Sequence, residues 1–273
     1  MTLLHRRLSY WMSLALLASI LAGCNSAGGQ AAGQPAGPAS TSAPTSGAPQ
    51  PAPQATAPAT EPPLSGSGPW KVTFAAEDGT ELSGTLYGNG KTAIVLAPTY
   101  PGGPAGWDSF ARSAVEKGYR ALTFDFRGYG SSKASQIAAD FPTDVRAAVK
   151  YVKDQGAEKI ILVGAGLGGT AAILVASKDS ALSGVALVSA SRGVEGLQVA
   201  DADLAALKIP SLWLAARNDL TQNVEDMAGL AGSSKKDLWI YEGSSLHGTF
   251  IFDGADGPDL ARRLLEFVAG VTT

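Results

Sequence analysis

The chain has 273 residues, of which 45% are hydrophobic, and its formal net charge at pH 7 is -3. This composition supplies enough apolar material for a sizeable core, and the length suits one large domain or two small ones. Because the net charge is small and the charged residues are scattered, the sequence argues against nucleic acid and other polyanions as partners.

The first 23 residues have the pattern of a secretory signal peptide. A basic n-region at residues 5–7 precedes an apolar run at 11–22, which is too short to span a bilayer comfortably. The run ends in Leu21-Ala22-Gly23-Cys24, which resembles the lipobox of bacterial lipoproteins. The resemblance implies cleavage before Cys24, lipidation of this cysteine, and an extracytoplasmic protein anchored in a membrane.

Residues 24–69 are predicted to be a lipidated cysteine followed by a disordered tether. The segment consists mainly of Ala, Pro, Gly, Ser, Thr and Gln, so it cannot bury enough surface to offset its ordering entropy. Cys24 is the only cysteine, which excludes a disulfide within the chain. Since His5 leaves with the signal peptide, His247 is the only histidine of the mature chain, and we expect no metal site and no cofactor.

Residues 70–273 are predicted to form one α/β domain. Short β-branched runs alternate with helical periodicity, which is typical of a mostly parallel sheet covered on both faces. The first two runs flank Asp78-Gly79 and predict an antiparallel hairpin. Apolar residues at helical spacing predict helices over 145–152 and 260–268. The expected strands are 71–75, 82–87, 92–96, 120–124, 159–163, 184–188, 211–215 and 238–241.

Polar or glycine-rich segments follow several of these strands. In open parallel sheets, sites lie at the carboxyl ends of the strands, so these segments are expected to meet at one edge. In chain order they are 97–103, 125–132, 164–169, Arg217-Asn218-Asp219 and 242–248.

These segments resemble those of the α/β hydrolases, and most nearly the branch of dienelactone hydrolases and peptidase-like esterases. The resemblance covers nearly all of 70–271. It rests on the run from Asp125 to Ser132, the elbow at 164–168, Asp219 and His247-Gly248, which occur in the family's order. It implies the α/β-hydrolase fold, with an eight-stranded, mostly parallel sheet and helices on both faces. Many relatives carry a large lid where this chain has 189–210, and so short a segment implies an open site and a small ligand.

The resemblance assigns roles to three positions. It implies that His247 is the general base, that Asp219 orients it, and that residue 166 is the nucleophile position. Asp253 is the alternative candidate for the acid that orients His247. The simpler alternatives are that His247 is an exposed loop residue and that Asp219 caps a helix at 221–230. The same resemblance places an oxyanion hole at the backbone N–H groups of Leu167 and of Thr99 or Tyr100.

Residue 166 departs from the family pattern. The elbow pattern is Gly-x-Ser-x-Gly, whereas this chain has Gly164-Ala165-Gly166-Leu167-Gly168, so the nucleophile side chain is absent. The elbow holds its central residue in a strained conformation that glycine adopts cheaply. Loss of the nucleophile costs a triad hydrolase about 10⁶ in turnover. We therefore expect that Gly166→Ser alone installs esterase activity.

Three functions are compatible with these residues. The favoured one is a degenerate hydrolase that keeps a pocket and has a binding role. The second is an active hydrolase of ester-type substrates, in which Asp219 and His247 activate water or a substitute hydroxyl of Ser189, Ser191 or Tyr100. The third is a dinucleotide-binding protein, because Gly164, Gly166 and Gly169 match Gly-x-Gly-x-x-Gly. This motif calls for an acidic residue after the next strand, where the chain instead has Ser189-Ala190-Ser191.

Overall fold

The computed structural model describes residues 68–273 except 195 and 222. The predicted signal peptide, the predicted lipidation site Cys24 and nearly all of the predicted tether lie outside these residues. In the described part of the chain, no helix combines the length and apolar character needed to cross a membrane.

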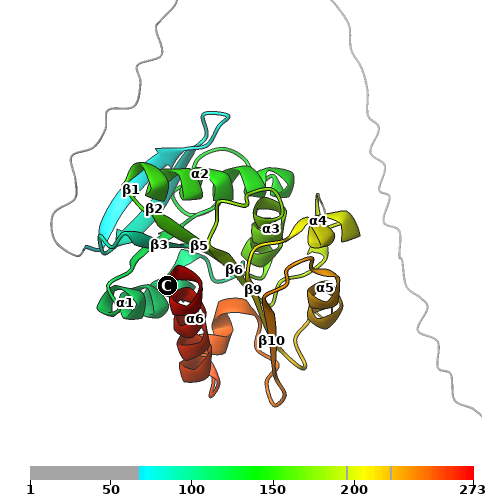
Figure 1. Cartoon of the computed structure of the whole chain (residues 1–273). Helices are drawn as coiled ribbons and strands as arrows, with labels where there is room; N and C mark the ends of the chain where they lie inside the picture. The colour runs from blue at the N-terminus through cyan, green and yellow to red at the C-terminus, as the bar shows by residue number, and fades with distance from the viewer. Residues whose placement is uncertain (1–67, 195, 222) are drawn as a thin grey trace, which may run out of the picture. The chain divides into compact units, whose positions relative to one another are not determined.

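An eight-stranded sheet runs through the described domain (Figure 1). Its strand order is β1-β2-β4-β3-β5-β6-β9-β10. The pairs β1/β2 and β2/β4 are antiparallel, and all other pairs are parallel. The strands are β1 (Trp70–Ala75), β2 (Glu81–Tyr87), β3 (Thr92–Ala97), β4 (Arg120–Phe124), β5 (Lys159–Ala165), β6 (Gly184–Val188), β9 (Ser211–Ala216) and β10 (Lys236–Tyr241).

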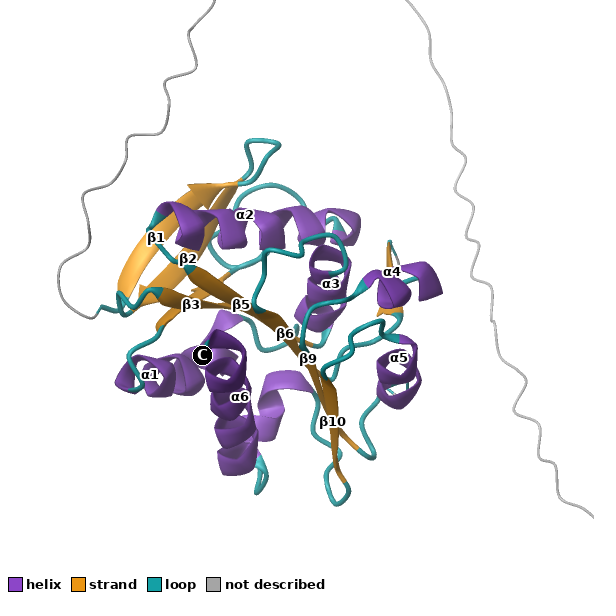
Figure 2. Cartoon of the chain, viewed as in Figure 1, coloured by secondary structure: helices purple, strands orange, loops and turns teal. Residues whose placement is uncertain are grey.

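Helices cover both faces of the sheet (Figure 2). On one face, α1 (Asp108–Glu116) and α6 (Gly257–Thr272) share a buried cluster with inward-facing strand residues. On the other, residues of α2 (Phe141–Asp154), α3 (Leu167–Ala176), α4 (Asp201–Ala206) and α5 (Val224–Leu230) form the second cluster. Two closed apolar layers explain why the central strands are buried on both sides.

The predicted strands and the predicted hairpin are confirmed, and β4 and β6 have the predicted bounds. The antiparallel ladder pairs Ala75 with Glu81 around the Asp78-Gly79 turn. The two predicted helices are confirmed as parts of α2 and α6. A two-stranded ribbon, β7 (Gly193–Val194) with β8 (Leu197–Gln198), was not predicted. Its strands are two residues long, too short for the alternation on which strand prediction depends.

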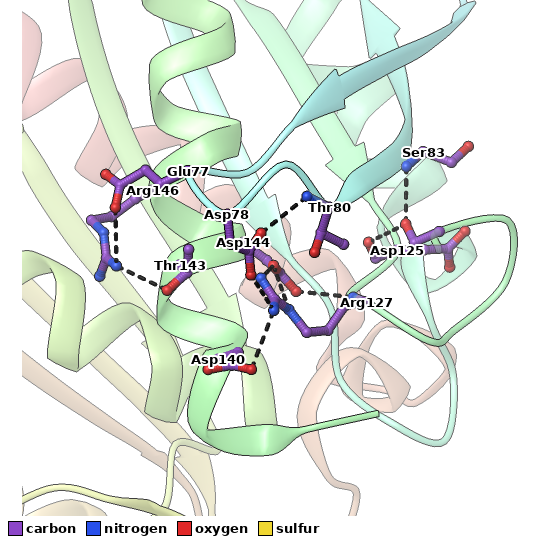
Figure 3. A network of polar contacts seen from close by, with 11 residues as sticks. Glu77, Asp78, Thr80, Ser83, Asp125, Arg127, Asp140, Thr143, Asp144 and Arg146 are labelled. Atoms are coloured by element: carbon purple, nitrogen blue, oxygen red, sulfur yellow. Dashed lines mark hydrogen bonds and ion pairs between the residues drawn. The ribbon is translucent and has the colours of Figure 1, made fainter. Parts of the chain in front are cut away.

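Arg127 is a buried hub that joins the first hairpin to α2 (Figure 3). Its side chain is 4% exposed, and its guanidinium bonds Asp144 twice, at 2.7 and 2.9 Å, and Asp78 at 2.7 Å. Its backbone N–H donates to the other oxygen of Asp144 at 2.9 Å. The side chain of Asp144 is completely buried. A buried carboxylate is tolerated only where it is paired and hydrogen-bonded, so the two residues depend on each other.

Candidate active site

Gly166 lies at a sharp turn between β5 and α3. The strand ends at Ala165, the helix begins at Leu167, and Gly166 is the N-cap with φ 51° and ψ -118°. A side chain strains this region of backbone, whereas glycine enters it at little steric cost. The turn therefore has the elbow geometry expected from the sequence.

The neighbouring glycines are required by close packing. A Cβ at Gly164 would stand 2.4 Å from the carbonyl oxygen of Gly168, and a Cβ at Gly168 would stand 2.5 Å from the carbonyl oxygens of Ala97 and Pro98. At Gly169, it would meet the Ala190 side chain at 2.9 Å. Packing of α3 against β3, β5 and the end of β6 thus accounts for the glycine run without a bound phosphate.

The structure brings Asp219 and His247 together from the ends of β9 and β10. His247 Nδ1 lies 2.8 Å from Asp219 Oδ1. The Asp219 side chain is completely buried, whereas that of His247 is 27% exposed. Burial alone would raise the pKa of Asp219, but the His247 and Ser189 side chains favour its charged form and hold the pKa below its usual value. An ionised Asp219 keeps the His247 proton on Nδ1 and leaves Nε2 available as a base.

The alternative role of Asp219 as a helix cap is wrong. The N-cap of α5 is Asn223, four positions beyond Asp219. Asp219 Oδ1 instead accepts the backbone N–H of Thr221 at 3.1 Å. Asp253, the reserve acid, is exposed at the end of the 3₁₀ turn η3 (Gly248–Asp253).

Ser189 supports this pair from the centre of the sheet. It follows β6, is completely buried, and has a φ of 52°, which is unusual for a residue with a side chain. Its Oγ accepts the backbone N–H of Gly248 at 2.9 Å. Ser189 thus holds the residue next to His247 and lies against Asp219. Sequence reasoning considered Ser189 only as a substitute nucleophile and missed this positioning role. The signal that could have revealed it is a serine directly after a buried strand.

Two side chains converge on the point where a Cβ of residue 166 would stand. Thr99 Oγ1 lies 2.3 Å from that point, His247 Nε2 lies 2.7 Å from it, and Thr99 Cβ lies 3.2 Å from it. His247 therefore faces the elbow. The three nearest atoms belong to Thr99 and His247, and none belongs to the hydroxyl residues proposed as substitutes.

Those substitute hydroxyls are engaged elsewhere. The Tyr100 hydroxyl donates to Asp125 Oδ1 at 3.2 Å, and its ring stacks on Tyr129 with centroids 3.8 Å apart. Burial and the nearby Asp125 raise the pKa of Tyr100 strongly. Ser191 Oγ lies 3.2 Å from Thr170 Oγ1, a residue of α3. Tyr100 and Ser191 therefore lack the contacts to His247 that nucleophile activation requires.

The predicted oxyanion donors lie at the same turn. Leu167 is the first residue of α3, and the first N–H groups of a helix have no partner inside it. Gly168 donates its N–H to the Pro98 carbonyl at 3.0 Å, which holds the loop carrying Thr99 and Tyr100 against the helix terminus. Among residues 68–273, apart from the two that are not described, no three His, Cys, Asp or Glu side chains are grouped as metal ligands.

Comparisons with known proteins agree with this topology. The model of the alpha/beta hydrolase fold family matches residues 92–227. The uncharacterized protein YfhR of Salmonella typhi is 31% identical over 109 residues, covering 36% of this chain and 37% of that protein. A 2-hydroxy-6-oxononadienedioate/2-hydroxy-6-oxononatrienedioate hydrolase of Klebsiella pneumoniae is 36% identical over 91 residues, covering 32% and 31%. The matches thus span about a third of the length of these curated relatives.

Solved structures share the fold over most of their length. An esterase of Pyrococcus furiosus superposes with a TM-score of 0.66 at 17% identity, covering 76% of this chain and 92% of that one. An enol-lactonase of Burkholderia xenovorans has a TM-score of 0.59 at 16% identity, covering 72% and 99%. The strand order, the elbow between β5 and α3, the matched family model and these neighbours together identify residues 68–273 as a domain of the α/β-hydrolase fold.

Proposed function

We propose that this domain is a degenerate hydrolase that binds a small carboxyl- or ester-bearing molecule without acyl transfer. The observation that carries the proposal is that Gly166 stands at the elbow, while Asp219 and His247 still contact each other at the same site. An acyl-enzyme mechanism needs a nucleophile whose proton the imidazole accepts, and Gly166 has none. What remains is His247 Nε2 at the elbow and the backbone N–H of Leu167, which has no partner within α3. Such groups suit a carbonyl or carboxylate oxygen.

The ligand of this proposal carries an apolar portion. Three large apolar side chains adjoin the pair in sequence: Leu220, which is 90% exposed, and Leu246 and Phe250, each 37% exposed. Phe250 also lies against the loop of Thr99, because its ring is 3.6 Å from a Cβ built on Gly102. Exposed apolar groups around a polar centre are typical of ligand sites. A short-chain acid or ester therefore fits better than a sugar or a polyanion.

Ester hydrolysis and ligand binding can be measured on the same protein. With 4-nitrophenyl acetate and butyrate, we expect the natural chain to be no faster than its His247→Ala variant. A fluorophosphonate probe, which labels activated hydroxyls, is expected to leave the whole domain unlabelled. Hexanoate should raise the melting temperature of the natural chain and not that of His247→Ala. Turnover that depends on His247 would overturn the proposal.

A second candidate is slow hydrolysis by water activated at His247. It is favoured by the 2.8 Å contact with Asp219 and by the lowered pKa of that carboxyl, which keep the base oriented. General-base assistance contributes typically 10²–10⁴-fold, far less than a full triad. This candidate predicts turnover that His247→Ala abolishes and that leaves no covalent adduct.

We also propose that the protein is anchored by a lipid on Cys24, from the lipobox pattern of residues 21–24. Expressed in a bacterium, the natural chain is expected in the membrane fraction. Cys24→Ser should move it to the soluble fraction or block its processing. An unchanged membrane fraction would count against lipidation.

A further inference from the structure

Thr99 occupies the space that a side chain at position 166 would need. Its Oγ1 is 2.3 Å and its Cβ 3.2 Å from the point where a Cβ would stand on Gly166. Real Cβ atoms essentially never approach another heavy atom within 3.0 Å, and His247 Nε2, at 2.7 Å, also falls inside this limit. His247 Nε2 is the far end of a side chain that is 27% exposed and can shift, whereas Thr99 is completely buried. The Thr99 side chain is β-branched, so it has little rotational freedom with which to withdraw. Gly248 also packs closely on Thr99, because a Cβ on Gly248 would meet Thr99 Cβ and Oγ1 at 3.1 Å.

The Thr99 hydroxyl is also an unpartnered polar group. Thr99 is completely buried, and its Oγ1 has no hydrogen-bond partner in the described part of the chain. Buried hydroxyls are normally paired, so this one calls for an explanation. Because the oxygen is covered, a ligand cannot reach it as the site stands. The hydroxyl therefore fills space beside His247 Nε2 and is not presented as a reacting group.

We propose that residues 99 and 166 form a coupled pair, in which Thr99 has closed the space left by the missing nucleophile. The inference rests on the proposed degenerate function and adds a residue to it. The site lacks activity because of both Gly166 and Thr99, and not because of Gly166 alone. It differs from the expectation that Gly166→Ser alone installs esterase activity, and the two expectations predict different results for the single variant. The conflict arises at the Cβ, which every serine rotamer shares, so no choice of χ1 relieves it.

The pair can be tested by a double-mutant cycle on the full chain, with Gly166→Ser, Thr99→Gly and the combined variant. In 4-nitrophenyl acetate hydrolysis, we expect the combined variant to exceed Gly166→Ser by about 10²-fold, the loss that a misplacement of about 1 Å causes. Gly166→Ser is also expected to lower the melting temperature further in the Thr99 background than in the Thr99→Gly background.

Thr99→Val is the matched control, because valine fills the same volume without the hydroxyl. Combined with Gly166→Ser, it should remain as inactive as Gly166→Ser alone. By itself, Thr99→Val should leave the melting temperature unchanged or raise it by about 2–4 °C, because it removes an unpaired buried hydroxyl. If the serine variants do not fold, the cycle with Gly166→Ala measures the same Cβ contact through melting temperatures.

Equal activity of Gly166→Ser and the combined variant, or equal melting shifts in both backgrounds, would overturn the coupling while leaving the degenerate function intact. Ester hydrolysis by the natural chain that Thr99→Val abolishes would overturn both, because the Thr99 hydroxyl would then be the nucleophile. Hydrolysis by the natural chain that Thr99→Val leaves unchanged would overturn the proposed function only.

Discussion

In the variant that combines Gly166→Ser with Thr99→Gly, a further Asp219→Asn substitution is expected to lower kcat for 4-nitrophenyl acetate by about 10⁴-fold. The reason lies in the 2.8 Å contact between Asp219 Oδ1 and His247 Nδ1. An asparagine at this position can donate to Nδ1, which moves the imidazole proton to Nε2. The imidazole then cannot accept a proton from the introduced hydroxyl.

Asp253→Asn is the control for this measurement. Asp253 is the other acid considered from the sequence, but it is exposed on η3, and the acid facing Nδ1 is Asp219. We expect Asp253→Asn to leave kcat within a factor of about 2, as is usual for surface changes away from a site. Equal losses for the two variants would remove Asp219 from its assigned role.

Replacing Arg127 by methionine is expected to destabilise the domain by about 3–5 kcal/mol, since it leaves the buried carboxylate of Asp144 without its partner. For a domain of this size, the melting temperature should fall by roughly 10 °C. Chemical denaturation followed by circular dichroism measures the effect. The loss should be largely recovered when Asp144→Leu is added, because the unpaired charge is then removed as well.

Arg146→Met provides the comparison. Arg146 lies on the same helix as Asp144, but its ion pair with Glu77 is longer, at 3.7 Å, and the two side chains are 44% and 70% exposed. Exposed pairs contribute about 0–1 kcal/mol. A loss at Arg127 no greater than that at Arg146 would show that the buried network is not a major source of stability.

The fold was predictable because periodicity and topology agree along this chain. The strands in the centre of the sheet are apolar after their first residue, as in Val163 and Leu187, and lie between helical segments. This pattern allows few arrangements other than a parallel sheet with helices on both faces. The ribbon of β7 and β8 was not predicted because strands of two residues carry no hydrophobic repeat.

The site was predictable only where chain order carries information. Asp219 and His247 follow consecutive strands that are neighbours in the sheet, so their meeting follows from topology. The side chain of Thr99 carries no such signal. Its sequence position suggested a backbone donor, whereas its side chain turns toward Gly166, a contact between residues from different strands that only packing determines. Ser189 is similar, because its bond to Gly248 joins segments far apart in the chain.

That bond between Ser189 and Gly248 has a dynamic consequence. The loop of His247 leaves β10, which is at the edge of the sheet, yet it is held by Ser189 at the end of β6, two places further in. Edge strands commonly open more easily than central ones, because fewer buried contacts hold them. If β10 frays, the hydrogen bond between Gly248 and Ser189 therefore still holds the loop of His247 to the interior of the sheet. Opening of the site therefore requires this bond to break in addition to any fraying of the edge, which adds about 0.5–1.5 kcal/mol to its cost.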